Sequence, residues 1–296
     1  MSEAHTSFPG HLGGIRLIEF SPDCRRFLSA DLRMGVSVWE DGVKVRTYEF
    51  ADDDTKSSAY SRVHAINVTP DGRYAFVAAG LKIRCIDLEF GYLSWQYRAP
   101  NMFGFIRTAP RALAINKEGE ILVSFDSGTL EVWTPDGRQR ARWRANDSPM
   151  MLAGLPDGNR FVGSDGYGLS IWDVADRARI LATHTDMKVY GLATYKNSDK
   201  VLLRLPGRLA TFDVFAERLR NDVHILPGLP YVDVTSDGDR IVHGEGRDAV
   251  LLDGGLNYVM TFTASENRII TAKFVPDQRQ VVLGLDDGSI EWQDYE

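Results

Sequence analysis

A short pattern recurs seven times along this 296-residue chain, and its spacing limits the folds that the chain can adopt. Each copy is a run of alternating apolar and polar residues that closes on an aromatic or bulky apolar residue. The closing residues are spaced 47, 47, 39, 40, 40 and 40 residues apart and are Trp39, Ile86, Trp133, Trp172, Phe212, Leu252 and Trp292. A period of about 40 to 45 residues is typical of one four-stranded blade of a β-propeller. The repeat therefore predicts an all-β, seven-bladed β-propeller of four-stranded antiparallel blades, which forms a single domain over residues 1–296.

Turn residues divide each copy into four expected strands. The first strand ends at a turn such as Ser21-Pro22-Asp23 or Thr69-Pro70-Asp71-Gly72, where proline presets one dihedral angle and glycine accepts a positive φ. A hairpin rich in glycine and aspartate, such as residues 126–128, separates the second strand from the third. The fourth strand is the most polar, as in residues 139–143 (QRARW), and this polarity suits an exposed sheet edge.

The two ends of the chain complement each other. The last copy stops at residue 296 with three expected strands, whereas residues 4–8 form a spare segment ahead of the first copy. We expect this N-terminal segment to pair with the third strand of the last blade and to complete it. Such pairing removes the open edge that the last blade would otherwise present.

Three motifs resemble those of a known family. Gly10-His11 precedes the first copy, residues 20–23 (FSPD) form its first turn, and Trp172-Asp173 closes the fourth copy. In these motifs, and in the repeat over nearly its whole length, the chain resembles the WD-repeat propeller family. The resemblance implies that His11 ties a loop to its blade. It also implies that the connections between blades form a top face where protein partners dock.

Composition narrows the functional classes. The formal net charge of −7 argues against a general nucleic-acid binder, which needs a basic field to attract phosphates. Two cysteines are too few for a disulfide framework, and strand alternation predicts that Cys85 is a buried free thiol. Residues 1–10 lack the basic start and apolar core of a secretory signal, and no apolar stretch approaches the ~18 residues of a membrane span. We expect a cytoplasmic protein that does not enter the membrane.

No pattern has the spacing of a catalytic or metal site. The glycine-rich residues 163–168 lie between two expected strands, so a hairpin is favoured over a phosphate-binding loop, which needs a helix N-terminus. The aspartate runs at 52–54 and 286–287 lack the ligand spacing of a calcium loop. The histidines are scattered, at His5, His11, His64, His184, His224 and His243. We expect no catalytic residue, metal or cofactor; the alternative is an enzyme or small-ligand sensor that uses the central channel.

Two connections lengthen their copies, and we predict that a partner binds there. Residues 50–62 (FADDDTKSSAYSR) are polar and acidic, whereas residues 98–111 (RAPNMFGFIRTAPR) combine apolar side chains with arginine. Loops usually run over the surface, and aromatic residues with arginine are enriched at binding hot spots. The predicted partner-binding residues are Met102, Phe103, Phe105, Ile106, Arg107, Arg111, Tyr60, Asp52, Asp53 and Asp54. In a second interpretation, which stays open, Phe103 and Phe105 fold onto the blade and extend its core.

The pattern as a whole predicts a non-catalytic scaffold or adaptor that binds a protein or peptide partner within a multi-protein assembly. A weaker signal concerns the charge of that partner. Basic residues stand at or just before the expected first strands, and they are Arg16, Arg62, Arg111, Lys188 and Arg268. If these residues converge, they would favour an acidic or phosphorylated peptide.

Overall fold

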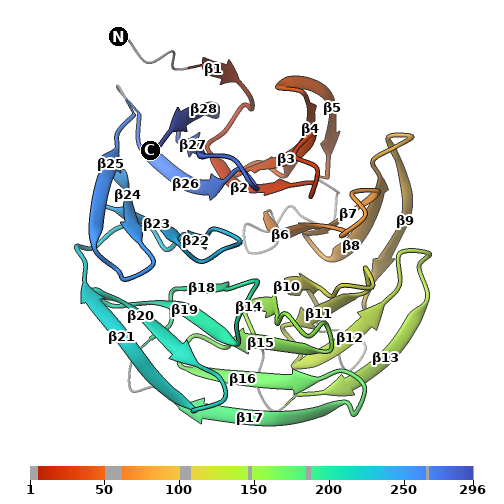
Figure 1. Ribbon diagram of the computed structural model, residues 1–296. Coiled ribbons are helices and arrows are strands. Elements are labelled where there is room, and N and C mark those ends of the chain that lie inside the picture. The colour runs from red at the N-terminus through yellow and green to blue at the C-terminus, as the bar shows by residue number, and fades with distance from the viewer. Residues whose placement is uncertain are drawn as a thin grey trace. The chain divides into compact units, whose positions relative to one another are not determined.

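The computed structural model describes residues 6–50, 62–100, 108–145, 149–184, 188–264 and 267–295. These residues form 28 β-strands in seven four-stranded antiparallel sheets. The fold is therefore an all-β, seven-bladed propeller, as the repeat predicts, and each sheet is one blade (Figure 1). The chain divides into two compact units, Glu49–Leu192 and Met1–Tyr48 with Ala193–Glu296.

The unit Glu49–Leu192 holds three sheets, whose strands follow one another in chain order. The first sheet consists of β6 (Val63–Val68), β7 (Tyr74–Ala79), β8 (Lys82–Asp87) and β9 (Tyr92–Arg98). The second consists of β10 (Pro110–Ile115), β11 (Ile121–Phe125), β12 (Thr129–Trp133) and β13 (Gln139–Arg144). The third consists of β14 (Met151–Gly154), β15 (Arg160–Ser164), β16 (Gly168–Asp173) and β17 (Ala178–His184). The first strands β6, β10 and β14 lie side by side, and β9, β13 and β17 form the other edges of their sheets (Figure 1).

The other unit holds four sheets. One consists of β2 (Ile15–Phe20), β3 (Arg26–Asp31), β4 (Gly35–Glu40) and β5 (Val43–Glu49). The next consists of β18 (Gly191–Thr194), β19 (Lys200–Leu205), β20 (Arg208–Asp213) and β21 (Arg218–His224). It is followed by β22 (Val232–Val234), β23 (Arg240–Glu245), β24 (Asp248–Asp253) and β25 (Tyr258–Phe262). The last consists of β26 (Ile269–Phe274), β27 (Gln280–Leu285), β28 (Ser289–Asp294) and β1 (Thr6–Pro9).

The N-terminal strand β1 is the fourth strand of the last sheet. It pairs antiparallel with β28, so that Thr6 lies opposite Trp292 and Pro9 lies opposite Ser289. The segment predicted to make this pairing, residues 4–8, overlaps β1 at residues 6–8, and residues 4 and 5 lie outside the described residues. The pairing covers the backbone edge that β28 would otherwise expose.

Most of the residues that close each copy lie in the hydrophobic core. Trp39, Ile86, Trp133, Trp172 and Phe212 are buried, as is Leu252, whereas Trp292 is partly buried. In the unit Glu49–Leu192, Trp133 packs with Phe76, Ile83 and Val123 in a cluster shared by the sheets β6–β9 and β10–β13. Cys85 belongs to the same cluster, and it is a buried free thiol, as the alternation predicts. Burial raises the pKa of this thiol to about 12.

The turns after the first strands use the expected chemistry. In the sheet β6–β9, the backbone N–H of Thr69 donates to the carbonyl of Tyr74 at 2.8 Å, and Gly72 has a φ of 71°. The Thr69 hydroxyl donates to Asp71, which also accepts from the N–H of Arg73. These local bonds satisfy polar groups at the turn without help from distant segments. None of the described residues form a helix with the length and apolar character that crossing a membrane would require.

Candidate functional site

Most of the predicted partner-binding residues cannot be placed. Met102, Phe103, Phe105, Ile106 and Arg107 lie outside the described residues, as do Tyr60, Asp52, Asp53 and Asp54. The two interpretations of Phe103 and Phe105 therefore both stay open. Arg111 is the one predicted residue that is described, together with the residues on either side of the gap at 101–107.

Arg111 ties the start of β10 to the hairpin between β11 and β12. Its Nη2 lies 3.4 Å from Oδ2 of Asp126, and the two side chains are about three-quarters buried. Oδ1 of Asp126 accepts from the backbone N–H of Ala109 at 3.0 Å, just before β10. An arginine held in this way supports the hairpin, and its predicted contact with a partner stays a prediction. For this residue the geometry favours a structural role.

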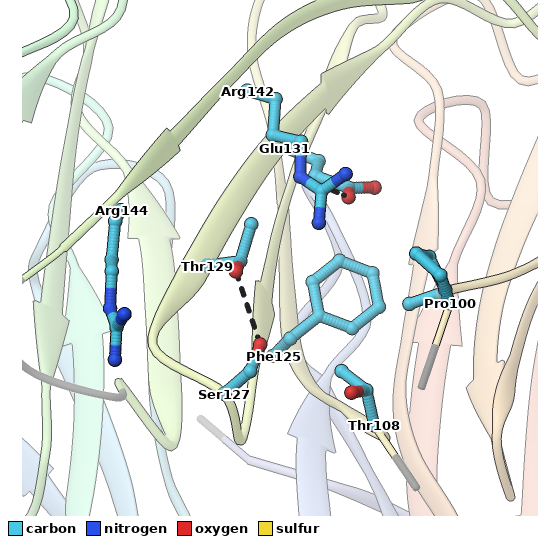
Figure 2. Close-up of a pocket in the computed structure, with 9 residues that line it drawn as sticks. Pro100, Thr108, Phe125, Ser127, Thr129, Glu131, Arg142 and Arg144 are labelled. Atoms are coloured by element: carbon cyan, nitrogen blue, oxygen red, sulfur yellow. Dashed lines mark hydrogen bonds and ion pairs between the residues drawn. The ribbon is translucent and has the colours of Figure 1, made fainter. Parts of the chain in front are cut away.

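A hollow of about 160 Å³ opens beside this hairpin, at the two ends of the long connection 98–111. Ala99 and Pro100 line it from the end of β9, and Thr108 lines it from the segment that leads into β10. The sheet β10–β13 supplies the remaining lining residues, which are Phe125, Ser127, Thr129, Glu131, Arg142 and Arg144. Figure 2 shows the Phe125 ring between Thr129 on one side and Pro100 and Thr108 on the other.

Glu131, on β12, carries the buried negative charge of the hollow. Its side chain has no exposed surface, its Oε2 accepts from Nε1 of Trp133 at 3.0 Å, and its Oε1 lies 3.4 Å from Nε of Arg142. The Tyr97 hydroxyl approaches the same Oε1 at 3.5 Å. Burial raises the pKa of Glu131, and these donors lower it only in part. A carboxylate in this position requires its donors, because an unpaired buried charge is costly.

The positive side of the hollow comes from β13. Arg140, Arg142 and Arg144 are all exposed residues of this strand, whose register with β12 shifts between Val132 and Trp133. Arg140 pairs with Glu120 at 3.1 Å, and Arg142, half exposed, pairs with Glu131. Arg144 is exposed, and no ion pair or hydrogen bond joins its side chain to another described residue. Two arginines and one carboxylate leave the hollow with one excess positive charge.

Hydroxyl groups and an aromatic ring complete the lining. The Ser127 hydroxyl donates to Oγ1 of Thr129 at 3.1 Å, between the guanidinium of Arg144 and the Phe125 ring (Figure 2). Thr108 and Phe125 are buried. The hollow therefore combines an apolar wall, cationic groups and several hydroxyls. Such a lining suits an anionic group carried on a short apolar stem.

In the sheet β2–β5, hydrogen-bonded side chains occupy the space beside the hairpin between β3 and β4, the position that corresponds to the hollow. There, Nδ1 of His11 lies 3.3 Å from Oδ2 of Asp31, and Nε2 of His11 lies 2.7 Å from the Ser29 hydroxyl, which accepts from Nε1 of Trp39 at 2.8 Å. With Nδ1 protonated, all four side chains are satisfied: Ser29 donates to Nε2, and His11 donates to Asp31. The tie between His11 and its blade is the one that the resemblance implies.

A second feature of the unit Glu49–Leu192 is a group of exposed apolar side chains around the hairpin 165–167. Met150, Tyr167 and Tyr190 are 53%, 60% and 44% exposed. Their segments converge, because Met150 donates its N–H to Ser164 and Val189 donates its N–H to Gly166. Lys188 stands over the ring of Tyr190, 5.3 Å from its centroid. We call Met150, Tyr167, Lys188 and Tyr190 the aromatic patch.

Two charged clusters lie in the other unit. Nζ of Lys273 lies 3.3 Å from both Glu19 and Asp233, which joins the first strands of three sheets by ion pairs. Nη1 of Arg204 lies 3.1 Å from Nδ1 of the buried His243, and burial, together with this arginine, lowers the pKa of His243 to about 4. The part of the chain that the structure describes contains no group of three or more His, Cys, Asp or Glu side chains placed to hold a metal ion.

The hollow is the feature that the sequence analysis missed. From the sequence, the run QRARWR of β13 is predicted only as the polar edge of a blade, and Glu131 is not among the predicted site residues. The sequence does contain a signal for the hollow, because the charged Glu131 stands at the position of β12 where the first copy has the small Ser37. No protein-family model matches this chain, and no curated protein is similar to it. The likeness to WD-repeat propellers therefore rests on the motifs alone.

Proposed function

We propose that this protein is a non-catalytic interaction platform, which binds a protein or peptide partner on the unit Glu49–Leu192. The β-propeller fold commonly serves as a scaffold for protein interactions. The observation that carries the proposal is that the hollow and the aromatic patch stand at the hairpins of two consecutive blades, β10–β13 and β14–β17.

The size of the hollow supports a side chain of a partner as its occupant. Pockets for drug-sized ligands and cofactors have volumes of roughly 300 to 1,000 Å³. The hollow offers about 160 Å³, and it is open on one side. A single side chain of a bound segment suits this space better than a whole cofactor.

The composition of the aromatic patch supports a docking role as well. Exposed tyrosine and methionine are enriched in protein interfaces, and each supplies a large contact area at low entropic cost. Because the ends of the connection 98–111 line the hollow, the proposal keeps this connection as part of the docking face. The connection 50–62 stays a prediction.

Capture of partners from native extract with matched variants tests the proposal. Tyr167→Ala combined with Tyr190→Ala should reduce the recovery of a specific partner at least tenfold, because aromatic hot-spot residues commonly contribute 2 kcal/mol or more. Tyr258→Ala combined with Val259→Ala is the matched control, since these residues are exposed on β25 of the other unit. Equal recovery with the patch variant and the control variant would rule out this docking face.

A further inference from the structure

We propose that the hollow in the sheet β10–β13 is an anion subsite, which receives one acidic or phosphorylated side chain of a bound peptide. The inference rests on the proposed docking function and states what that function selects. The shared chemistry is a negatively charged group on a short stem. An acidic residue and a phosphorylated residue are its two possible sources.

The arginines of the hollow are exposed to an incoming group, whereas its carboxylate is not. Glu131 has no exposed surface, and its two carboxylate oxygens are engaged by Trp133 and Arg142. Arg144 is exposed, and Arg142 retains half of its surface. An entering side chain therefore meets guanidinium groups before it can meet the carboxylate. The accessible surface of the hollow is cationic although the protein has a net charge of −7.

The buried Glu131 orients Arg142. By pairing with Nε of Arg142, Glu131 holds that side chain against the wall of the hollow, and Figure 2 shows its guanidinium beside Glu131. This pairing neutralises one arginine and leaves the other available. Arg142 is thereby preoriented, so its remaining N–H groups bind a carboxylate or a phosphate with a smaller loss of rotamer entropy than a freely rotating arginine would. Arg144 is the principal anion ligand, and Arg142 contributes its remaining N–H groups.

The lining of the hollow also suits the methylene groups of a short acidic side chain. Phe125, Pro100 and Ala99 form an apolar wall that can cover methylene groups, while Thr108, Ser127 and Thr129 bring hydroxyls to the same space. A volume of about 160 Å³ is large enough to hold several water molecules. A short acidic side chain fills such a space and replaces its water. Charge-assisted hydrogen bonds to the guanidinium then compensate for its desolvation.

An array of short peptides with randomised flanks and one fixed central residue tests the inference directly. The central residue is glutamate, phosphoserine or glutamine, where glutamine has nearly the shape of glutamate without its charge. For the wild-type protein, we expect the charged peptides to bind at least tenfold more strongly than the glutamine peptides. A preference for phosphoserine over glutamate would identify the phosphorylated source, and equal binding of the two would identify any acidic residue.

Two variants make the test specific. Arg144→Gln should reduce the charge preference about tenfold, because a charge-assisted hydrogen bond corresponds to at least that factor in affinity. Arg140→Gln is the matched control, since it removes the same charge from β13 but takes away the partner of Glu120. The control should keep the preference. Thermal melting of both variants shows that they remain folded.

The outcomes separate the subsite from the docking function. Equal binding of charged and glutamine peptides, or an equal loss in the two variants, overturns the anion subsite and leaves the docking face standing. Failure of every peptide to bind overturns the subsite too, and the capture experiment with the Tyr167 and Tyr190 variants then decides the docking face independently.

Discussion

Two blades share the backbone of the hairpin between their second and third strands but differ in the side chains around it. In the sheets β2–β5 and β10–β13, the hairpin between the second and third strands has one residue of positive φ, Met34 at 71° and Gly128 at 74°. In both sheets, the residue after the second strand is bonded to the segment before the first strand. The N–H of Leu32 donates to the carbonyl of Gly14, and the N–H of Asp126 donates to the carbonyl of Ala109. On this shared backbone, the first blade carries a hydrogen-bonded network, and the other has the hollow.

The two copies differ at the last residue of the second strand. The residue three positions before the positive-φ residue is Asp31 in the first blade and Phe125 in the other. Asp31 accepts from the backbone N–H of Arg33 and of Gly35, both at 2.8 Å, and it pairs with His11. Phe125 can hold neither the hairpin nor a histidine by hydrogen bonds. Among the described residues, a hydrogen-bonded network at this hairpin accompanies a filled space, and an apolar side chain accompanies the hollow.

The buried acids of the two corners also differ in their electrostatics. Burial acts to raise the pKa of Asp31, but hydrogen bonds from His11, Gly35 and Arg33 outweigh it, so that the pKa is lowered. For Glu131 the order is reversed, and burial keeps the pKa raised despite Trp133 and Arg142. Asp31 therefore stabilises its blade as an anion, whereas the ionisation of Glu131 costs stability.

The largest expected effect follows from placing the acid of the first blade into the other. Phe125→Asp should lower the free energy of unfolding by about 4 kcal/mol, because it removes a buried ring and buries a carboxylate that has no histidine partner. Urea denaturation measures the loss. Phe125→Leu, which keeps an apolar side chain, should cost no more than about 1.5 kcal/mol. A loss below that level for the aspartate variant would mean that the hairpin N–H groups alone satisfy an acid here.

Removal of the acid from the first blade should have the next largest effect. Asp31→Ala should lower the free energy of unfolding by about 3 kcal/mol, because it leaves the donors at Arg33, Gly35 and His11, of which the last two are buried or nearly so, without an acceptor. Asp23→Ala, in an exposed turn, serves as the control and should cost less than about 1 kcal/mol. Equal losses in urea denaturation would contradict a special role for the network.

The two acids should respond to pH with opposite signs. The pKa of Asp31 lies below its usual 3.8, so its contribution is present above that pH and disappears as the pH falls through the folded-state value. The stability advantage of the wild type over Asp31→Asn should therefore shrink below about pH 3.8. The pKa of Glu131 lies above its usual 4.5, so the wild type should lose stability relative to Glu131→Gln as the pH rises above 4.5. Unfolding titrations between about pH 3 and pH 7 measure both trends, and parallel trends would refute the contrast.

At about pH 7 the Glu131→Gln substitution itself should change stability by less than about 1 kcal/mol. The amide oxygen can still accept from Trp133, and the loss of the pairing with Arg142 is offset by the lower cost of burying a neutral group. Glu131→Ala, which leaves the Trp133 N–H without an acceptor and opens a cavity, should cost about 2 kcal/mol. Equal losses for the two variants in urea denaturation would show that the charge of Glu131 is essential.

The smallest effect on stability is expected at the rim of the hollow. Arg144→Gln should change the free energy of unfolding by no more than about 0.5 kcal/mol, because Arg144 is exposed and no described residue pairs with it. Thermal melting checks this expectation, and a larger loss would mean that Arg144 is structural. Together with the peptide array, this variant separates binding from folding.

Local chemistry made much of the fold predictable. The closing residues from Trp39 to Leu252 lie in the core, Cys85 is a buried thiol, and the spare N-terminal segment supplies β1. Each of these features depends on a pattern of a few residues, repeated seven times. The hollow was harder to predict. Arg144 alternates like the residues of any polar edge strand, and Glu131 alternates like the residues of any buried strand. The pairing of Arg111 with Asp126 could not be predicted either, because it depends on the hairpin between β11 and β12. The role of Arg111 in partner binding stays a prediction.

The sequence by itself determined the repeat, the number of blades and the position of each turn, because strand period and turn chemistry act over short distances. It also marked the connection 98–111 as unusual through its length and composition. Only the tertiary structure decided that the ends of this connection meet Phe125, Glu131 and Arg144 around an open space. The physical reason is that a hollow is the absence of packing between segments distant in the chain. No local pattern records whether the opposing side chains fill that space, as they do around Asp31, or leave it open.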